Sequence, residues 1–445
     1  MLRGMLLALA LLAATVLAAD LPAGFDPAHW PGRKEPSAEY KALVNQLREA
    51  QKQHDAAKVK QIVAEIRKDL GSYAGVPEVK PEYGTPIERT EPNLNAVEAI
   101  CWRSFESLKG SNGWELAARA KPNQQPRLRV TFRTTMSNLR AFEAGVPHAE
   151  EYRAAGIQGL DYLVTQQAST GVFGYPYDPN ATSGLKVQAA AIARRGAGSG
   201  LKMTEGAWLI EDLDDGGLQF DNGVAGAGLL YGYALTGNRK YLDSARRAAD
   251  WAVGRPIVPN WNYNSYSGYL LARMYRVTGE RKYLEAAIDK FEVGVLPGQM
   301  DNGRWVDQHN ARPNYHSLMI RNLVEYTLAL EQAKDSRAAE VRRRTKLALD
   351  SLAEETDRYG APNTDEGLPL EALSISLIAF GPSPAWEEAA NIQVNYAVNH
   401  LLPGLIEARR GRPETLTAYV LWRRVQERRA RSCEVSITEC LRDRK

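Results

Sequence analysis

Cysteine, histidine and long hydrophobic runs are scarce in this sequence of 445 residues. Its three cysteines and six histidines show no paired spacing, which argues against a structural zinc site. Beyond the N-terminal segment no run is long and apolar enough to cross a membrane. The net charge of +3 is nearly balanced, and basic residues are not interleaved with aromatic ones as nucleic-acid binding requires. We therefore expect neither nucleic acid nor membrane insertion.

The N-terminal segment is the one place where a targeting pattern occurs. Arg3 supplies a positive charge, the residues Leu6 to Leu12 are apolar, and small residues follow up to Ala19. This order predicts a secretory signal peptide over residues 1–19, cleaved after Ala18 or Ala19. The apolar run is too short to favour a membrane anchor. We expect export to the periplasm or the medium.

The few cysteines fit an exported protein. Cys433 and Cys440 are close enough in sequence to close a small loop near the C-terminus. Cys101 stands beside Trp102 and is expected to be a buried thiol.

Signals for β-strands are also few, apart from Leu128 to Phe132, whereas helical periodicity is widespread. Residues 20–95 are expected to form peripheral helices and a linker, with a charged helical hairpin at residues 37–70 and a proline-rich segment at residues 71–95. The C-terminal residues 409–445 are rich in arginine and are expected to be a basic helix or tail. Its arginines would form a solvated face or a docking surface for an acidic polymer.

An internal repeat organises the main body. The segment Asn222–Ala245 aligns at one fixed offset with Asn264–Ala287, and both follow the pattern Leu-x3-Tyr-x2-Thr-Gly-x-Arg-Lys-Tyr-Leu-x2-Ala. The first helix carries an apolar stripe, the glycine ends it in the left-handed conformation, and a second helix returns. Neither helix can bury its apolar face alone, so neighbouring hairpins must stack. Weaker copies flank this pair on both sides.

This hairpin pattern resembles that of the (α/α) toroid enzymes, which include six-hairpin glycosidases and several polysaccharide lyase families. The resemblance covers roughly residues 95–405 and implies an all-α, incomplete toroid of about five to seven hairpins, with the catalytic domain expected over residues 96–408. It also implies that substrate lies where the inner helices begin. The polar and aromatic residues before these helices are therefore the candidates for substrate binding.

Two reactions fit the residues at these positions, and the first is β-elimination on an anionic, uronate-containing polysaccharide. That reaction needs donors that neutralise a carboxylate, for which we select Asn264, His316 and Arg321. It also needs a proton acceptor and donor, for which we select Tyr263 or Tyr266. Substitution of either tyrosine by Phe, or of His316 by Ala, should then abolish lyase activity without unfolding the chain. Further candidates for substrate contacts are Trp261, Asn222, Asp221, Asn314, Tyr315, His309 and Tyr175, the last in a Gly/Ala-rich stretch at residues 171–204 that would be a subsite loop or a lid.

The second reaction is hydrolysis by two carboxylates, for which Asp214 and Asp215 are the candidates. The Asp-Asp dipeptide resembles what some toroid glycosidases use, but Asp-Asp-Gly-Gly is also ordinary turn chemistry. No cofactor is expected, although Asp212, Asp214 and Asp221 together have the oxygen ligands that calcium prefers. A third possibility is a toroid that binds glycan without cleaving it. At the starts of the helices, clusters of Asn, Tyr and His are denser than clusters of carboxylates, which favours the lyase.

Overall fold

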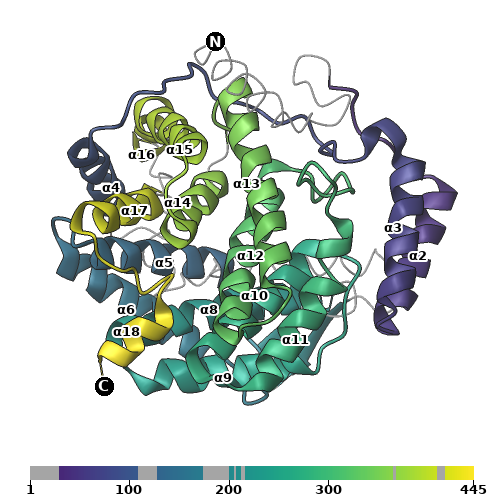
Figure 1. Ribbon diagram of the computed structural model, residues 1–445. Coiled ribbons are helices and arrows are strands. Elements are labelled where there is room, and N and C mark those ends of the chain that lie inside the picture. The colour runs from purple at the N-terminus through teal and green to yellow at the C-terminus, as the bar shows by residue number, and fades with distance from the viewer. Residues whose placement is uncertain are drawn as a thin grey trace, which may run out of the picture.

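The computed structural model describes residues 30–108, 128–173, 200–204, 207–211, 216–363, 367–407 and 416–444 (Figure 1). Within these ranges the chain is helical except for one antiparallel pair of strands, β1 (Gly200–Thr204) and β2 (Ala207–Glu211). No helix in the described ranges is both long and apolar enough to cross a bilayer.

Six of the described helices form an inner ring in which each helix packs against the next. In ring order they are α5 (Leu128–Ala144), α8 (Gly216–Thr236), α10 (Trp261–Thr278), α12 (Pro313–Ala333), α14 (Leu368–Phe380) and α17 (Leu416–Arg428). Because α17 also packs against α5, the ring is complete where the sequence predicts an open one.

An outer layer of helices covers the ring, each packed against the inner helix that precedes it in the chain. These are α6 (Ala149–Thr165), α9 (Arg239–Val253), α11 (Arg281–Glu292), α13 (Ala338–Tyr359) and α15 (Pro384–Tyr396), which continues through the π-helical turn η4 (Ala397–Leu401) into α16 (Leu402–Glu407). The sixth inner helix, α17, is covered by α4 (Leu94–Leu108) from the other end of the chain. The predicted all-α toroid of stacked hairpins is confirmed.

The repeat motif explains the turn of each hairpin. Gly279 ends α10 with φ of 74°, and its N–H donates to the carbonyl of Tyr275 at 2.7 Å. Gly237 has φ of 71° at the end of α8 and donates to Tyr233 at 2.8 Å. Because a side chain is strained in this left-handed region, glycine is required at both turns. Asn238 then caps α9 by accepting from the N–H of Lys240.

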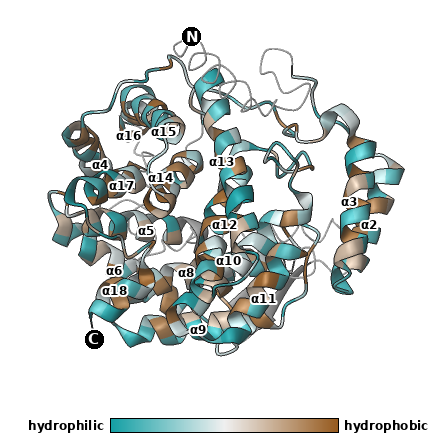
Figure 2. Cartoon of the chain, viewed as in Figure 1, coloured by the Kyte–Doolittle hydropathy of each residue, from teal (hydrophilic) through white to brown (hydrophobic). Residues whose placement is uncertain are grey.

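Small residues let the inner helices approach one another. A methyl group at Gly223 of α8 would collide with the backbone carbonyl of Tyr266 in α10. Hydropathy follows the layers as well: hydrophilic residues are prominent on the outer helix α13 and hydrophobic residues on the inner helix α14 (Figure 2). Burial of the inner faces is the main source of stability in such a stacked fold.

The N-terminal hairpin consists of α2 (Ala38–Lys52) and α3 (Ala56–Leu70) and lies beside the toroid (Figure 1). Its α3 helix contacts the short helix η3 (Leu296–Gly298), which belongs to the connection between α11 and α12. After the turn η1 (Gly71–Tyr73), the chain pairs with that same connection, because Gly75 donates to Val306 at 3.0 Å and Glu78 donates to Gln308 at 2.8 Å. The N-terminal segment is therefore joined to the toroid through the connection between α11 and α12.

The C-terminal region differs from the prediction of a basic tail after residue 408. The residues from Leu416 to Trp422 are buried, and α17 belongs to the ring. The chain then turns back so that Glu434 is fully buried, and it ends with α18 (Ile437–Asp443). A disulfide joins Cys433 to Cys440, a pairing that the sequence left open, and Cys101 is a buried thiol, as predicted. The strand signal at Leu128–Phe132 was wrong, since α5 begins at Leu128.

Candidate functional site

The inner helices begin on one face of the ring. Each hairpin returns the chain through an outer helix, so consecutive inner helices run in the same direction. The starts of α8, α10, α12 and α14 therefore share this face, here called the entrance face. The strand β2 contacts α8 and comes just before it in the chain.

A hydrophobic cluster lies near the entrance face in the middle of the ring, and we call it the aromatic floor. Its buried members come from α8, α10, α12 and α14, and partly buried residues from α5, α10 and α12 pack against them. The buried members are Phe220, Val224, Ala227, Tyr266, Tyr269, Leu318 and Leu368, and the partly buried ones are Phe132, Tyr263 and Tyr315. The ring centroids of Phe220 and Tyr266 are 4.2 Å apart. Those of Phe220 and Tyr263 are 5.9 Å apart, and these two rings are nearly perpendicular. Tyr263 and Tyr315 keep part of their surface exposed, so aromatic surface remains for stacking against sugar rings.

Charged residues replace hydrophobic ones about one to two turns further along α5, α10, α12 and α14. Arg140 of α5 forms two hydrogen bonds with Glu434, at 2.7 and 2.6 Å, and one with Glu371 of α14, at 2.8 Å. Arg321 of α12 donates to Glu434 at 3.1 Å and lies 3.9 Å from Glu371. Arg273 donates to the backbone carbonyl of Glu434. We call these five residues the charged layer.

Exposure distinguishes one carboxylate in this layer. The side chain of Glu434 is 0% exposed and that of Arg140 is 2% exposed, whereas that of Glu371 is 18% exposed. Burial alone would raise the pKa of Glu434, but Arg140, Arg321 and Arg273 lower it to about 2. Glu434 therefore acts as a fixed counter-ion for the arginines, and Glu371 is the carboxylate of the layer that solvent reaches.

The tyrosines beside this layer stay protonated. Burial raises the pKa of Tyr266 far above its usual value, Arg133 opposes that shift, and Glu371 adds to it. The hydroxyl of Tyr269 accepts hydrogen bonds from Arg273 at 2.7 Å and from Arg321 at 3.0 Å. Tyr266 is thus suited to donate a hydrogen bond and unsuited to remove a proton at neutral pH.

Three of the sequence-selected polar residues join inner helices to the outer layer. Asn222 donates to the carbonyl of Ala248 at 2.9 Å, and Asn264 donates to the carbonyls of Val258 and Gly294 at 2.6 and 2.9 Å. His316 contacts the carbonyl of Ala348 at 3.0 Å in the same manner. All three side chains are fully buried. They occupy matching places in three successive hairpins, which explains the repeated asparagine as a structural tie.

The electrostatics of His316 fit that structural place. Burial lowers its pKa to about 3, with a further contribution from Arg304, so the imidazole is neutral at physiological pH. Its ring also packs edge-on against Trp305 at 5.6 Å. The side chain of His316 is 0% exposed, so it does not reach solvent at the entrance face.

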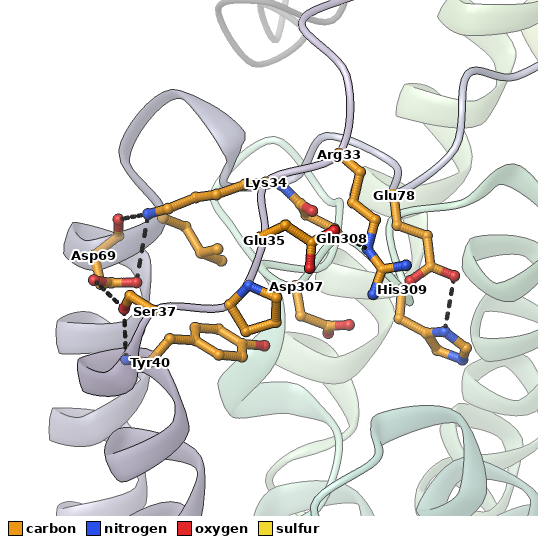
Figure 3. Close-up of a pocket in the computed structure, with 12 residues that line it drawn as sticks. Arg33, Lys34, Glu35, Ser37, Tyr40, Asp69, Glu78, Asp307, Gln308 and His309 are labelled. Atoms are coloured by element: carbon orange, nitrogen blue, oxygen red, sulfur yellow. Dashed lines mark hydrogen bonds and ion pairs between the residues drawn. The ribbon is translucent and has the colours of Figure 1, made fainter.

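The other selected residues divide between the floor, the core and the rim. Tyr263, Tyr266 and Tyr315 come together in the floor, and Arg321 lies in the charged layer. Trp261 and Asp221 are buried, and Asn314 is partly exposed. His309 stacks on Tyr315 at 4.6 Å and lines a pocket at the rim (Figure 3). Tyr175, Asp212, Asp214 and Asp215 lie outside the described residues.

Sequence reasoning missed Glu371, Arg140 and Glu434. Glu371 stands in the otherwise apolar stretch Leu368–Phe380, and this isolated carboxylate was the available signal. Nothing local marks Arg140 or Glu434, because their importance arises from a contact between the two ends of the chain. Among the described residues, no group of three or more His, Cys, Asp or Glu could hold a metal ion. Asp212 and Asp214 lie outside these residues, so calcium at Asp212, Asp214 and Asp221 stays a prediction.

No protein-family model and no curated protein sequence matches this chain. Among solved structures, a GH76 alpha-mannanase of Bacteroides thetaiotaomicron is 13% identical, with a TM-score of 0.51 over 75% of this chain and 99% of the mannanase. A family 76 glycoside hydrolase from a bovine strain of that species is 13% identical, with a TM-score of 0.50 over 75% of this chain and 78% of that one. A polysaccharide lyase is 11% identical, with a TM-score of 0.47 over 76% of this chain and 97% of the lyase.

At these identities the likeness concerns the fold. The chain has the (α/α) toroid architecture that its structural neighbours among carbohydrate-active enzymes also have.

Proposed function

We propose that this protein is a glycoside hydrolase that cleaves a polysaccharide bound across the aromatic floor. Partly exposed rings of Tyr263 and Tyr315 offer stacking surface for pyranose units. The family 76 glycoside hydrolases with which the chain shares its fold add support for this class of reaction.

The position of Glu371 is the observation that carries the proposal. Hydrolysis of a glycosidic bond uses one carboxyl group as acid and a second as base or nucleophile. Glu371 is the solvent-reached carboxylate of the charged layer, and its hydrogen bond from Arg140 fixes its orientation. We assign it the role of base or nucleophile. For the acid we propose Asp214 or Asp215, which directly precede α8 in the sequence.

β-Elimination is the second candidate, and the positive charge of Arg133 acting on Tyr266 favours it. The charge of Arg133 acts on Tyr266, which is a combination that could neutralise a uronate and protonate a leaving oxygen. Two points weaken it. The raised pKa of Tyr266 makes that tyrosine a poor proton acceptor, and Asn264 and His316, which were selected to neutralise the carboxylate, bind backbone carbonyls instead. Tyr263 would have to act as the base in this mechanism.

One assay separates these proposals. The purified protein is incubated with neutral polymers such as mannan and xylan and with polygalacturonate, alginate and glucuronan. New reducing ends without ultraviolet absorbance are expected and support hydrolysis. An absorbance rise from an unsaturated uronate product would instead establish β-elimination. Polymer binding with no shortening of any chain would leave the third possibility, a glycan-binding protein.

We also propose that the protein is exported. The disulfide between Cys433 and Cys440 supports this, since such bonds persist in oxidising compartments. N-terminal sequencing of protein recovered from the periplasm or the medium should give a chain that starts after Ala18 or Ala19. A cytoplasmic protein that begins at Met1 would contradict the proposal.

A further inference from the structure

A pocket lies at the rim of the toroid, between the N-terminal hairpin and the loop that leads into α12 (Figure 3). One wall is formed by residues 33–37, Tyr40 and the end of α3 at Asp69 and Leu70. The other wall is formed by Glu78 and by residues 307–309. Three segments far apart in sequence therefore meet here.

Internal bonds hold these walls in place without any ligand. Ser37 donates to the carboxylate of Asp69 at 3.3 Å and accepts from the N–H of Tyr40 at 2.9 Å. On the opposite wall, Glu78 contacts His309 at 3.3 Å, and its N–H donates to the carbonyl of Gln308 at 2.8 Å. A preformed pocket of this kind loses little entropy when it binds a ligand.

One side chain in the pocket has a buried polar atom without a hydrogen-bond partner in the described part of the chain. The side-chain amide nitrogen of Gln308 is buried and makes no hydrogen bond within the described part of the chain, and the residue as a whole is 9% exposed. Buried donors without a partner are rare and unfavourable. A ligand that brings an acceptor to Gln308 would satisfy this nitrogen.

The charges of the lining restrict the chemistry of the ligand. Four carboxylates face two basic side chains, namely Glu35, Asp69, Glu78 and Asp307 against Arg33 and Lys34. Burial raises the pKa of Tyr40, and Asp307, Asp69 and Glu78 raise it further, so Tyr40 keeps its proton and remains a donor. This surplus of acceptors suits the hydroxyl groups of a sugar and repels an anionic uronate.

One ring contact connects the pocket with the aromatic floor. His309 lines the pocket and stacks on Tyr315, a member of the floor, at 4.6 Å. The guanidinium of Arg312 covers the same Tyr315 ring at 4.3 Å. A polysaccharide that crosses the floor over Tyr315 therefore meets this pocket next.

From this arrangement we propose that the rim pocket is a subsite for an uncharged sugar unit of the substrate, away from the bond that is cleaved. The identity of the ligand as part of a polysaccharide rests on the proposed function. Gln308 and Arg33 donate to its hydroxyl or ring oxygens, and Asp307 and Glu35 accept from its hydroxyls. The N-terminal hairpin thereby contributes to substrate binding.

Calorimetric titration of the full chain with neutral manno-, xylo- and cello-oligosaccharides, and with oligogalacturonate, tests the proposal. At least one neutral series should bind, and more tightly than oligogalacturonate. Gln308→Leu and Arg33→Ala should each weaken that binding by roughly three- to tenfold, the effect of one lost hydrogen bond. Arg33 is exposed, so its variant tests the pocket even if Gln308→Leu folds poorly.

Glu39→Gln is the matched control, because Glu39 is exposed on α2 and does not line the pocket. It should bind as the unchanged protein does. Unchanged affinity in both pocket variants, tighter binding of oligogalacturonate, or no binding of any neutral series would overturn the proposal. Because titration needs no cleavage, binding with this pattern and no hydrolysis would refute only the proposed function, whereas hydrolysis with unaffected pocket variants would refute only the subsite.

Discussion

Arg140 in the first inner helix and Glu434 near the C-terminus form a fully buried ion pair with two hydrogen bonds, at 2.7 and 2.6 Å. This contact joins the beginning and the end of the toroid inside the ring. It also places Arg140 so that its Nη2, which donates to Glu434, donates to Glu371 as well.

Removal of Glu434 should strongly destabilise the protein. Glu434→Ala leaves Arg140 buried without this counter-ion, and breaking a buried pair costs about 3–5 kcal/mol. Denaturant unfolding would measure the loss. Asp443→Asn is the control, because Asp443 is 66% exposed and its contact with Arg431 is 3.8 Å. An equal effect of the two substitutions would contradict the structural importance of the buried pair.

Stability should fall as pH rises past the ordinary range of a carboxyl group, because of Glu143. Burial raises the pKa of Glu143 to about 7, although Tyr231 and Cys433 donate hydrogen bonds to it. The folded chain therefore holds this proton more tightly than the unfolded one. The stabilisation is fully present below about pH 4.5 and is lost by about pH 7, a change on the order of 3 kcal/mol.

Unfolding curves across that pH range, compared with those of Glu143→Gln, would test this expectation. The variant should lack the part of the pH dependence that Glu143 contributes. Parallel curves for the two proteins would show that the carboxyl group does not titrate as inferred.

Loss of the C-terminal disulfide should lower stability moderately. The bond between Cys433 and Cys440 closes a short loop that brackets Glu434. Loops of this length contribute roughly 2–3 kcal/mol through the unfolded state. A reducing agent should weaken the unchanged protein and leave the double variant Cys433→Ser, Cys440→Ser unaffected. Insensitivity of the unchanged protein to the reductant would refute the expectation.

The structural ties should affect folding more than turnover. Asn264→Ala leaves the carbonyls of Val258 and Gly294 without this donor, which should cost about 1–3 kcal/mol. His316→Ala removes the contact with Ala348 and should act similarly. Both variants should keep kcat at temperatures where they are folded. Loss of kcat in a fully folded variant would restore these residues as candidates for catalysis.

Substitution of Glu371 should affect turnover more than folding. If it is the base or nucleophile, Glu371→Gln should reduce kcat by roughly 10²–10⁴-fold. The amide keeps the size of the side chain and can still accept from Arg140, so the melting temperature should change little. Glu340→Gln, at a side chain that is 59% exposed, serves as control. Activity within a few-fold of the control would remove Glu371 from the mechanism.

The sequence was sufficient for features that depend on neighbouring residues. The Thr-Gly turn and the Arg-Lys-Tyr-Leu segment predicted the α8–α9 and α10–α11 hairpins, because helix ends are set by local backbone preferences. The closure of the ring was not predictable in this way. An arginine-rich sequence conceals α17, and its burial depends on a contact with α5.

The candidate site was predicted only in part, because long-range contacts decide which side chains meet. Aromatic residues at the helix starts, such as Tyr263 and Tyr315, do gather in the floor. Asn264 and His316 share the same segments, but helical periodicity turns them toward the outer layer. A single sequence shows which residues stand near an entrance and leaves open which side of the helix each one takes.

Closure of the ring by α17 and α4 also bears on how the molecule is made. A ribosome delivers the chain from its N-terminus, so α4 must wait for almost the entire polypeptide before its partner α17 exists. Until then the ring cannot close, and the surfaces of α5 and α14 that α17 covers stay exposed. The arginines that Glu434 binds also lack this counter-ion. Such long-range contacts form late and slowly. A chain that stops before Glu434 is therefore expected to leave the buried arginines without this counter-ion and to need a chaperone.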